Sequence, residues 1–171
     1  TTPAALDVSS EANIRKFMNE SDFNFLVNCT AYTAVDKAES DEENARRINA
    51  EAPGWLARCA REKSAGIIHI STDYVFDGSS NKPLQPSMPA RPNTVYGQTK
   101  LAGEEAVKRE NPQSIIIRTS WLYSAYGHNF VKTMLGLSDR AEVNVVFDQV
   151  GTPTYAGDLA TAILKILERS T

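Results

Sequence analysis

The stretch from Gly66 to Tyr74 reads Gly-Ile-Ile-His-Ile-Ser-Thr-Asp-Tyr and carries the main indication of the fold. Its segment 67–71 is a continuous run rather than an alternation of apolar and polar residues, bounded by a glycine and a polar cluster. Such a run predicts a strand that is covered on both faces of a sheet. His69 lies inside the run, so we interpret it as a packed core histidine and not as a catalytic group.

Runs of this kind alternate with helical patterns along the chain. We predict strands over residues 25–29, 67–71, 114–119 and 143–147, and helices over residues 11–19, 40–63, 93–110, 129–137 and 158–168. The second helix contains Pro53-Gly54, where we expect a kink or an interruption. This order predicts an α/β protein with a Rossmann-like, doubly wound parallel sheet. Such sheets usually have about six strands, so the sequence predicts an incomplete sheet whose first strands are missing.

The composition indicates one globular domain over residues 1–171. Of these residues 42% are hydrophobic, enough to bury a sizeable core without a disulfide or a structural metal. The 18 Lys and Arg residues and 21 Asp and Glu residues give a net charge of −3, with no basic block of the kind that binds nucleic acid. The apolar stretches fall well short of the roughly 20 residues that span a bilayer. We therefore predict neither a nucleic-acid nor a membrane partner.

The chain contains Cys29 and Cys59, and neither belongs to a Cys-x-x-Cys pair. Two lone cysteines in a domain of this size are typical of reduced core thiols in a cytosolic protein, so we expect a cytoplasmic location and no disulfide. The histidines His69 and His128 have no ligand partners at zinc-finger spacing. We therefore predict no metal site.

Polar clusters follow three of the predicted strands, over residues 28–32, 71–74 and 118–121. In open α/β sheets, ligands bind outside the carboxyl ends of the strands. Any one of these clusters is more simply explained by the polarity of loops. The prediction of a functional site rests on their combination with Tyr96 and Lys100.

Tyr96 and Lys100 are four residues apart in a predicted helix and so share one of its faces. A nearby ammonium group favours tyrosinate and lowers the pKa of a phenol from about 10 toward the working pH. Such a phenol can exchange a proton with a carbonyl or carbinol oxygen. The hydroxyl of Thr72, at the end of a strand, could hydrogen-bond the same oxygen. The pair alone is a weak indication, because an ordinary exposed helix pair has the same spacing.

With Ser71-Thr72-Asp73 upstream of the pair, the constellation resembles the extended short-chain dehydrogenase/reductase superfamily. Longer segments are similar to the dTDP-4-dehydrorhamnose reductase family, and the resemblance covers nearly all of the chain. These segments are AYTAVDKAES at 31–40, STDYVFDG at 71–78, VYGQTKLAGE at 95–104 and RTSWLY at 118–123.

The resemblance implies that a hydride passes from NADPH or NADH to the C4 keto group of dTDP-4-dehydro-6-deoxy-L-mannose, giving dTDP-L-rhamnose. It makes Tyr96 the proton donor. Lys100 then holds the nicotinamide ribose and tunes Tyr96, and Thr72 stabilises the reacting oxygen. Further positions match residues that contact the dTDP-linked deoxy sugar, namely Thr72, Asp73 and Trp121. Cofactor-binding residues are implied as well, with Thr30, Ala31 and Tyr32 along the cofactor, Asp7 and Val8 near the adenine, and Tyr96 and Lys100 at the nicotinamide.

The sequence also departs from the resembled family. Such a reductase begins with a strand and a G-x-x-G-x-x-G turn whose amides hold the pyrophosphate, and the nine glycines here contain no such spacing. We therefore expect the chain to be the central portion of an NAD(P)-binding reductase with part of the substrate-binding region. The 171 residues alone are expected to be inactive and to bind a nicotinamide dinucleotide without useful affinity.

Two other functions stay open beside carbonyl reduction. A sugar-nucleotide dehydratase or epimerase could use the same scaffold, but the resembled dehydratases carry Thr-Asp-Glu where this chain has Tyr74 in third place. A non-catalytic regulatory relative would not need Thr72, Tyr96 and Lys100 together. The residues that select NADPH or NADH lie outside this sequence, and the resemblance leaves a homodimer open.

Overall fold

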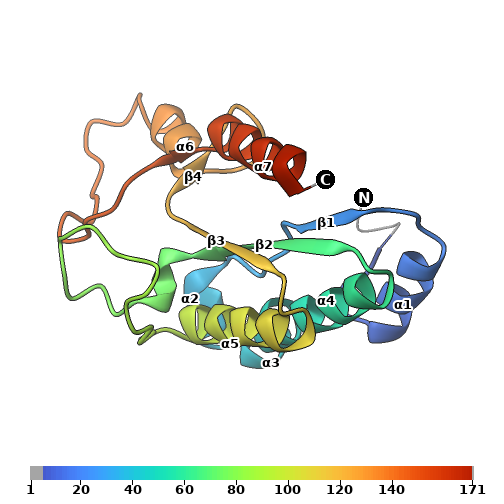
Figure 1. Ribbon diagram of the computed structural model, residues 1–171. Coiled ribbons are helices and arrows are strands. Elements are labelled where there is room, and N and C mark those ends of the chain that lie inside the picture. The colour runs from blue at the N-terminus through green and yellow to red at the C-terminus, as the bar shows by residue number, and fades with distance from the viewer. Residues whose placement is uncertain (1–5, 171) are drawn as a thin grey trace. The chain divides into compact units, whose positions relative to one another are not determined.

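The computed structural model describes residues 6–170 (Figure 1). They form two compact units, one made of residues 6–77 and 84–118, the other of residues 78–83 and 119–170. Each unit is described by itself below. The assignment of a single domain over residues 1–171 stays a prediction.

The first unit contains a three-stranded sheet whose order in space, β1-β2-β3, is also the order in sequence. The strands are β1 (Phe25–Asn28), β2 (Gly66–Thr72) and β3 (Ile115–Thr119). β1 and β2 run parallel, with Asn28 opposite His69. The first three predicted strands are therefore confirmed.

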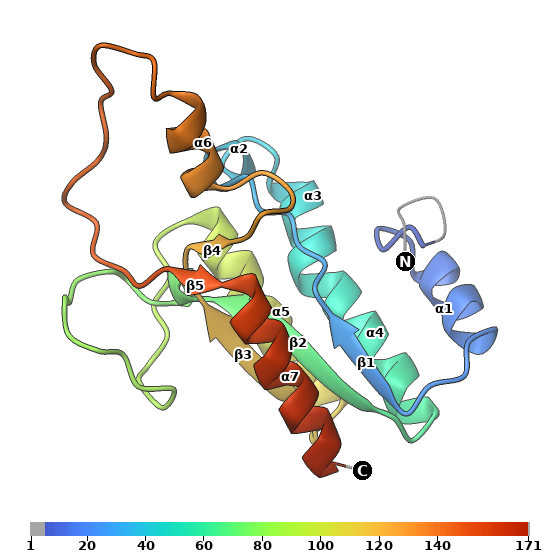
Figure 2. The ribbon, with the colours of Figure 1, turned by 90° about the horizontal axis from the view of Figure 1, so that it is seen from above.

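Helices of the first unit lie along one face of this sheet (Figures 1 and 2). Two of them, α4 (Ala52–Glu62) and α5 (Val95–Glu110), pack against each other and against β2. The other helical elements are α1 (Glu11–Asn19), α2 (Val35–Ala38), α3 (Glu42–Arg46), a π-helix η1 (Arg47–Glu51) and a 3₁₀ turn η2 (Asp73–Val75). α5 carries the predicted Tyr96 and Lys100 and brings both to β2.

The predicted break of the long helix at Pro53-Gly54 is wrong. The irregular segment is the π-helix Arg47–Glu51, and Pro53 sits in the first turn of α4, where a missing N–H costs little. Gly54 has a packing role instead, because a Cβ there would lie 3.2 Å from the Ala106 Cβ on α5.

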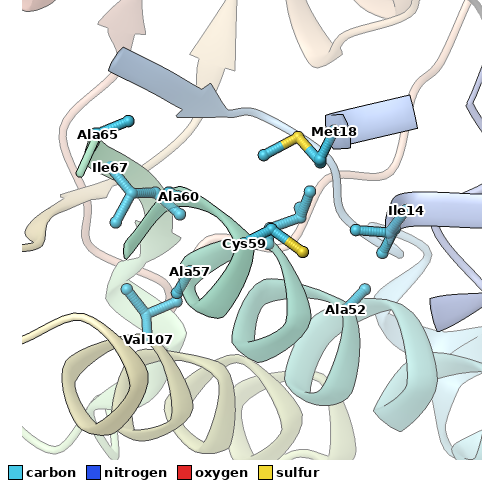
Figure 3. Packing of buried hydrophobic residues seen from close by; sticks show 10 residues of the cluster. Ile14, Met18, Ala52, Ala57, Cys59, Ala60, Ala65, Ile67 and Val107 are labelled. Atoms are coloured by element: carbon cyan, nitrogen blue, oxygen red, sulfur yellow. The ribbon is translucent and has the colours of Figure 1, made fainter. Parts of the chain in front are cut away.

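The core of the first unit lies between α1, α4, α5 and the sheet (Figure 3). The small side chains of α4 let its neighbours approach closely, and the labelled cluster is Ile14, Met18, Ala52, Ala57, Cys59, Ala60, Ala65, Ile67 and Val107. Cys59 is a buried free thiol, as predicted. Cys29 is free but exposed, so its assignment to the core is wrong. It follows β1 directly, in the polar segment beyond the covered part of the strand.

The second unit contains two short parallel strands, β4 (Leu122–Tyr123) and β5 (Thr154–Tyr155), and the helices α6 (Phe130–Gly136) and α7 (Ala156–Ser170). Both helices were predicted, but the strand predicted at 143–147 is wrong. That segment forms no strand, and Phe147 within it is 96% exposed. A β-branched run forms a strand only where a neighbouring strand pairs with it. None of the helices within residues 6–170 is long and apolar enough to cross a membrane.

Candidate active site

The carboxyl end of β2 turns sharply at Thr72. The backbone of Thr72 is extended. The Thr72 hydroxyl accepts a hydrogen bond from Tyr74 N at 3.2 Å and so caps the 3₁₀ turn Asp73–Val75. The same hydroxyl donates to Asp73 Oδ1 at 3.2 Å. Thr72 is only 6% exposed, so this hydroxyl is held in place at the end of a buried strand.

The first turn of α5 packs directly against this 3₁₀ turn. Thr94 caps the helix, its hydroxyl accepting from Gly97 N at 3.0 Å. A Cβ on Gly97 would lie 2.2 Å from Tyr74 O, so the two backbones touch where glycine leaves room. The rings of Tyr74 and Tyr96 pack edge to face, with 5.4 Å between the ring centres. This contact brings the Tyr96 phenol to Thr72.

Tyr96 is 9% exposed, and its environment holds its phenol in the neutral form. Burial raises the pKa of Tyr96, and the hydrogen bond with Thr72 lowers it by less. The sequence-based expectation of a lowered phenol pKa is therefore wrong. Burial dominates, and the Lys100 ammonium is directed at a backbone carbonyl. A neutral phenol is the form that can donate a proton.

Lys100 is buried beneath the end of β2 with 2% of its surface exposed. Its Nζ donates to Ile70 O at 2.7 Å. Burial lowers the pKa of Lys100 to about 8, against the opposing effects of Glu104 and Cys29. The alternative of an ordinary exposed helix pair is thus excluded. Because an ammonium carries three N–H donors, Lys100 keeps donors for a ligand beyond the bond to Ile70.

Glu104 and Arg118 complete the surroundings of Lys100, and the sequence interpretation assigned neither a role. Glu104 lies one turn beyond Lys100 and is fully buried. Arg118 donates to it twice, from Nε at 2.8 Å and from Nη2 at 2.7 Å. Burial opposes ionisation of Glu104, but the two bonds from Arg118 hold its pKa below the usual value.

The segment after β1 is held by Asn28, which is 2% exposed. Asn28 Oδ1 accepts from Thr30 N at 3.1 Å and from Thr30 Oγ1 at 2.7 Å, so its Nδ2 donates to His69 Nδ1 at 3.0 Å. This arrangement places the proton of His69 on Nε2. Burial lowers the pKa of His69 to about 3. His69 is a neutral core residue, as predicted, that helps to fix Thr30.

Asp7 and Val8 have local structural contacts. Asp7 Oδ1 accepts from Ser9 N and Ser9 Oγ at 2.9 and 2.7 Å, and Val8 packs against the core cluster of Figure 3. Their position near an adenine stays a prediction. The position of Ala31 along the cofactor also stays a prediction. Within residues 6–170 no group of three or more His, Cys, Asp and Glu side chains could hold a metal ion.

The family model described as the RmlD substrate binding domain matches residues 1–171. The chain belongs to the RmlD substrate binding domain family. It is 44% identical, over 98% of its length, to a dTDP-4-dehydrorhamnose reductase of Mycolicibacterium smegmatis, of which it covers 51%. The chain thus spans about half the length of the curated relatives it matches.

Solved structures agree with this assignment. One is a dTDP-4-dehydrorhamnose reductase of Clostridium acetobutylicum with a TM-score of 0.94 and 46% identity, over 99% of this chain and 60% of that one. Another is a dTDP-4-dehydrorhamnose reductase of Bacillus anthracis in complex with NADP. Its TM-score is 0.94 and its identity 38%, and the match covers 98% of this chain and 60% of that one. The predicted Rossmann-like fold and the resemblance to dTDP-4-dehydrorhamnose reductases are both confirmed.

Trp121 of this RmlD-family chain belongs to the second unit and has an unusual backbone. Its φ is +46°, which costs a residue other than glycine about 1–3 kcal/mol. Thr154 N donates to Trp121 O at 3.3 Å, and a Cβ on Gly151 would lie 2.9 Å from the indole. The side chain is nevertheless 46% exposed. Strain that presents an exposed aromatic ring favours a binding role, so substrate contact by Trp121 stays our prediction.

Replacing Gly97 by alanine is expected to destabilise the RmlD-family fold at the site. The added Cβ can be accommodated only if α5 or the 3₁₀ turn moves, because the atom it meets belongs to the backbone. We expect urea unfolding of the whole protein to show a loss of about 1–3 kcal/mol, even though alanine favours a helix. Gly136→Ala is the control, since a Cβ there meets nothing within 4 Å. Equal stability of the two variants would contradict the close contact.

Proposed function

We propose that the whole protein is an NAD(P)H-dependent reductase that converts dTDP-4-dehydro-6-deoxy-L-mannose to dTDP-L-rhamnose. The observation that carries the proposal is the buried group formed by Thr72, Tyr96 and Lys100 at the carboxyl end of β2. The relatives named dTDP-4-dehydrorhamnose reductase support it. So does the structure of such a reductase with NADP.

The residues of this chain suit proton transfer to a carbonyl that is being reduced. A bound nicotinamide supplies the hydride. Tyr96 donates its phenolic proton to the C4 oxygen of the sugar, and the Thr72 hydroxyl hydrogen-bonds the same oxygen as charge develops there. Lys100 binds a ribose hydroxyl with its remaining donors, and its positive charge stabilises the phenolate that Tyr96 becomes. Burial of all three side chains keeps water from competing for these hydrogen bonds.

The surroundings of Tyr74 favour reduction over elimination of water. The Tyr74 ring packs on Tyr96, and burial raises the pKa of its phenol. A tyrosine in this state cannot replace the carboxylate that the resembled dehydratases carry at this position. In our proposal Asp73 and Trp121 contact the dTDP-linked sugar, and the protein acts in the cytoplasm.

The direct test is an assay of the whole protein with the 4-dehydro sugar nucleotide and either NADPH or NADH. We expect stoichiometric oxidation of the cofactor and dTDP-L-rhamnose as the product identified by NMR. A product formed by elimination of water from the sugar would instead indicate a dehydratase. An epimerised ketone formed without net oxidation of the cofactor would indicate an epimerase.

The proposal predicts an alkaline limit of activity that is set by Lys100. Its ammonium is present below its pKa of about 8 and is lost above it. We therefore expect kcat/KM to fall about tenfold per pH unit above that value, since kcat/KM reports groups of the free enzyme. Cys29→Ser is the control, because the Cys29 thiol interacts with Lys100 and is another group that titrates at alkaline pH. Because the Cys29 thiolate raises the pKa of Lys100, a limb that persists in Cys29→Ser at the same or a lower pH assigns it to Lys100, and a limb that disappears assigns it to Cys29. A flat profile to about pH 9.5 would contradict the role.

A further inference from the structure

Glu104 is a fully buried carboxylate on the helix that carries Tyr96 and Lys100, and no step of the proposed reaction uses it. It lies four residues after Lys100, so the two side chains share one face of α5, with about 5–6 Å between their Cβ atoms. Lys100 is buried as well. Opposite charges this close attract each other much more strongly in a protein interior than in water. Lys100 Nζ nevertheless donates to Ile70 O, at 2.7 Å.

The guanidinium group of Arg118 binds both oxygens of Glu104. Its Nε donates to Oε1 at 2.8 Å and its Nη2 donates to Oε2 at 2.7 Å. This two-pronged geometry is specific to arginine, because the planar guanidinium matches a carboxylate. Other contacts fix the guanidinium itself, which lies 5.0 Å from the centre of the Phe76 ring and donates from Nη1 to Pro86 O at 3.4 Å. Each oxygen of Glu104 therefore already has a strong donor, and that donor comes from β3.

Without Arg118, the Glu104 carboxylate would need another cation, because an unpaired charge in a protein interior is strongly destabilising. Lys108 follows Glu104 by one helical turn but is exposed, so its ammonium would have to leave water to reach a fully buried group. The ammonium of Lys100 is already out of water. We therefore expect Lys100 to move from Ile70 O toward Glu104 when Arg118 is removed.

We propose that Arg118 is a positioning residue that keeps the Glu104 carboxylate from binding Lys100, and so holds the Lys100 ammonium at the carboxyl end of β2. At that place the remaining donors of the ammonium serve the ribose, a consequence that rests on the proposed reductase function. The buried ion pair thus has a role beyond stability. Arg118 matters to the site only because Glu104 is present, and this condition makes the inference testable with two variants.

The pKa of Lys100 reports this rearrangement without any activity. Burial lowers it to about 8, while Glu104 on the same helix and the Cys29 thiol beyond β1 act in the opposite direction. His69 on β2 also interacts with Lys100 but is neutral. We expect NMR titration of isotope-labelled lysine side chains, in the whole protein without cofactor, to show a higher pKa of Lys100 in Arg118→Met, because its ammonium then pairs with a carboxylate. The Lys100 signal is identified by its absence in Lys100→Met.

Titration of NADPH and steady-state kinetics test the consequence for the site. In Arg118→Met we expect NADPH binding to weaken about tenfold, because a hydrogen bond from a charged donor is lost. We expect kcat/KM to fall about 10²-fold, because a displacement of about 1 Å in a site costs that much. The alkaline limit of kcat/KM should move to higher pH together with the pKa of Lys100.

The double variant Glu104→Leu with Arg118→Met removes the carboxylate as well as the arginine. Lys100 then has no competing partner on α5, so NADPH binding and kcat/KM should recover most of what Arg118→Met loses. Because Glu104 raises the pKa of Lys100, the alkaline limit of the double variant should lie at a lower pH than in the wild type. Opposite shifts of the limit in the two variants are a result that a purely structural role of Arg118 does not give.

Arg58→Met is the matched control. Arg58 forms the same two-pronged pair with Glu110 at the far end of α5, with Nε and Nη2 donating at 3.1 and 3.2 Å. Its loss should lower stability without changing the pKa of Lys100, NADPH binding or kcat/KM. Arg118→Lys keeps a positive charge without the planar fork, so it should show smaller losses in the same direction as Arg118→Met. It replaces Arg118→Met in the test if that variant does not fold.

An unchanged pKa of Lys100 in the folded Arg118 variants, as protonation of Glu104 would give, would overturn the inference. So would equal losses in Arg58→Met, or losses that the double variant does not recover, since these would assign the effect to packing of the arginine stem on Phe76. A wild-type protein that binds NADPH but does not reduce the sugar would refute the proposed function alone. The lysine titration and the binding comparison would still decide the role of Arg118.

Discussion

Tyr96→Phe is expected to lower kcat of the whole protein by about 10²- to 10⁴-fold while leaving the fold intact. The phenylalanine keeps the edge-to-face contact with the Tyr74 ring, which depends on the aromatic carbon atoms. It loses only the hydroxyl group, whose proton we propose is donated to the sugar oxygen. Because burial raises the pKa of this phenol, the wild-type residue holds that proton throughout the neutral range.

Tyr74→Phe provides the matched control for this experiment. Tyr74 is the ring partner of Tyr96 and also has a raised pKa through burial, but it has no assigned proton transfer. Its variant should keep kcat within a few-fold of wild type. Thr72→Val should fall between the two, since it removes one hydrogen bond to the developing charge. Near-normal turnover of Tyr96→Phe, measured at saturating substrate, would refute the assignment of the proton donor.

The structure brings Thr72, Tyr96 and Lys100 together at the end of β2, and this part of the arrangement follows from local patterns in the sequence. A continuous apolar run marks β2 because a strand covered by helices has little polar surface, and the polar residues after it therefore mark its carboxyl end. The spacing of Tyr96 and Lys100 places both on one helix face whatever the tertiary structure is. Together with the resemblance to the reductase family, these two patterns brought Thr72, Tyr96 and Lys100 into one prediction.

Properties that depend on burial could not be predicted from the sequence. The direction of the Tyr96 pKa shift requires knowing how much of the phenol is covered, and spacing alone predicted the opposite sign. Asn49 contacts residues far away in sequence through a π-helix, for which no sequence pattern was available. The exposed Phe147 belongs to a run with strand propensity that no neighbouring strand pairs with.

Arg118→Met is expected to cost about 3–5 kcal/mol of unfolding free energy, because it leaves the Glu104 carboxylate buried without its partner. Glu104 has no exposed surface, and the Arg118 side chain is 19% exposed with its guanidinium 5.0 Å from the centre of the Phe76 ring. Arg47→Met is the control, since its ion pair with Glu43 is at the surface, with exposures of 44% and 85%. Breaking an exposed pair changes stability by at most about 1 kcal/mol. Equal losses in the two variants, measured by urea unfolding of the whole protein, would contradict this role of the buried pair.

The pH dependence of stability provides a second measure of the same pair. Arg118 depresses the pKa of Glu104 below its ordinary value of 4.5, so the pair stabilises the fold above that pH. This contribution is lost as the pH falls through the depressed pKa of the folded state. Glu104→Gln cannot ionise and should therefore lack this part of the acid-induced loss of stability. The double variant Glu104→Leu with Arg118→Met removes both charges together, so it should be more stable than Arg118→Met alone. Stability of the double variant no better than that of Arg118→Met would mean that packing of the arginine stem on Phe76, and not the unpaired carboxylate, accounts for the loss.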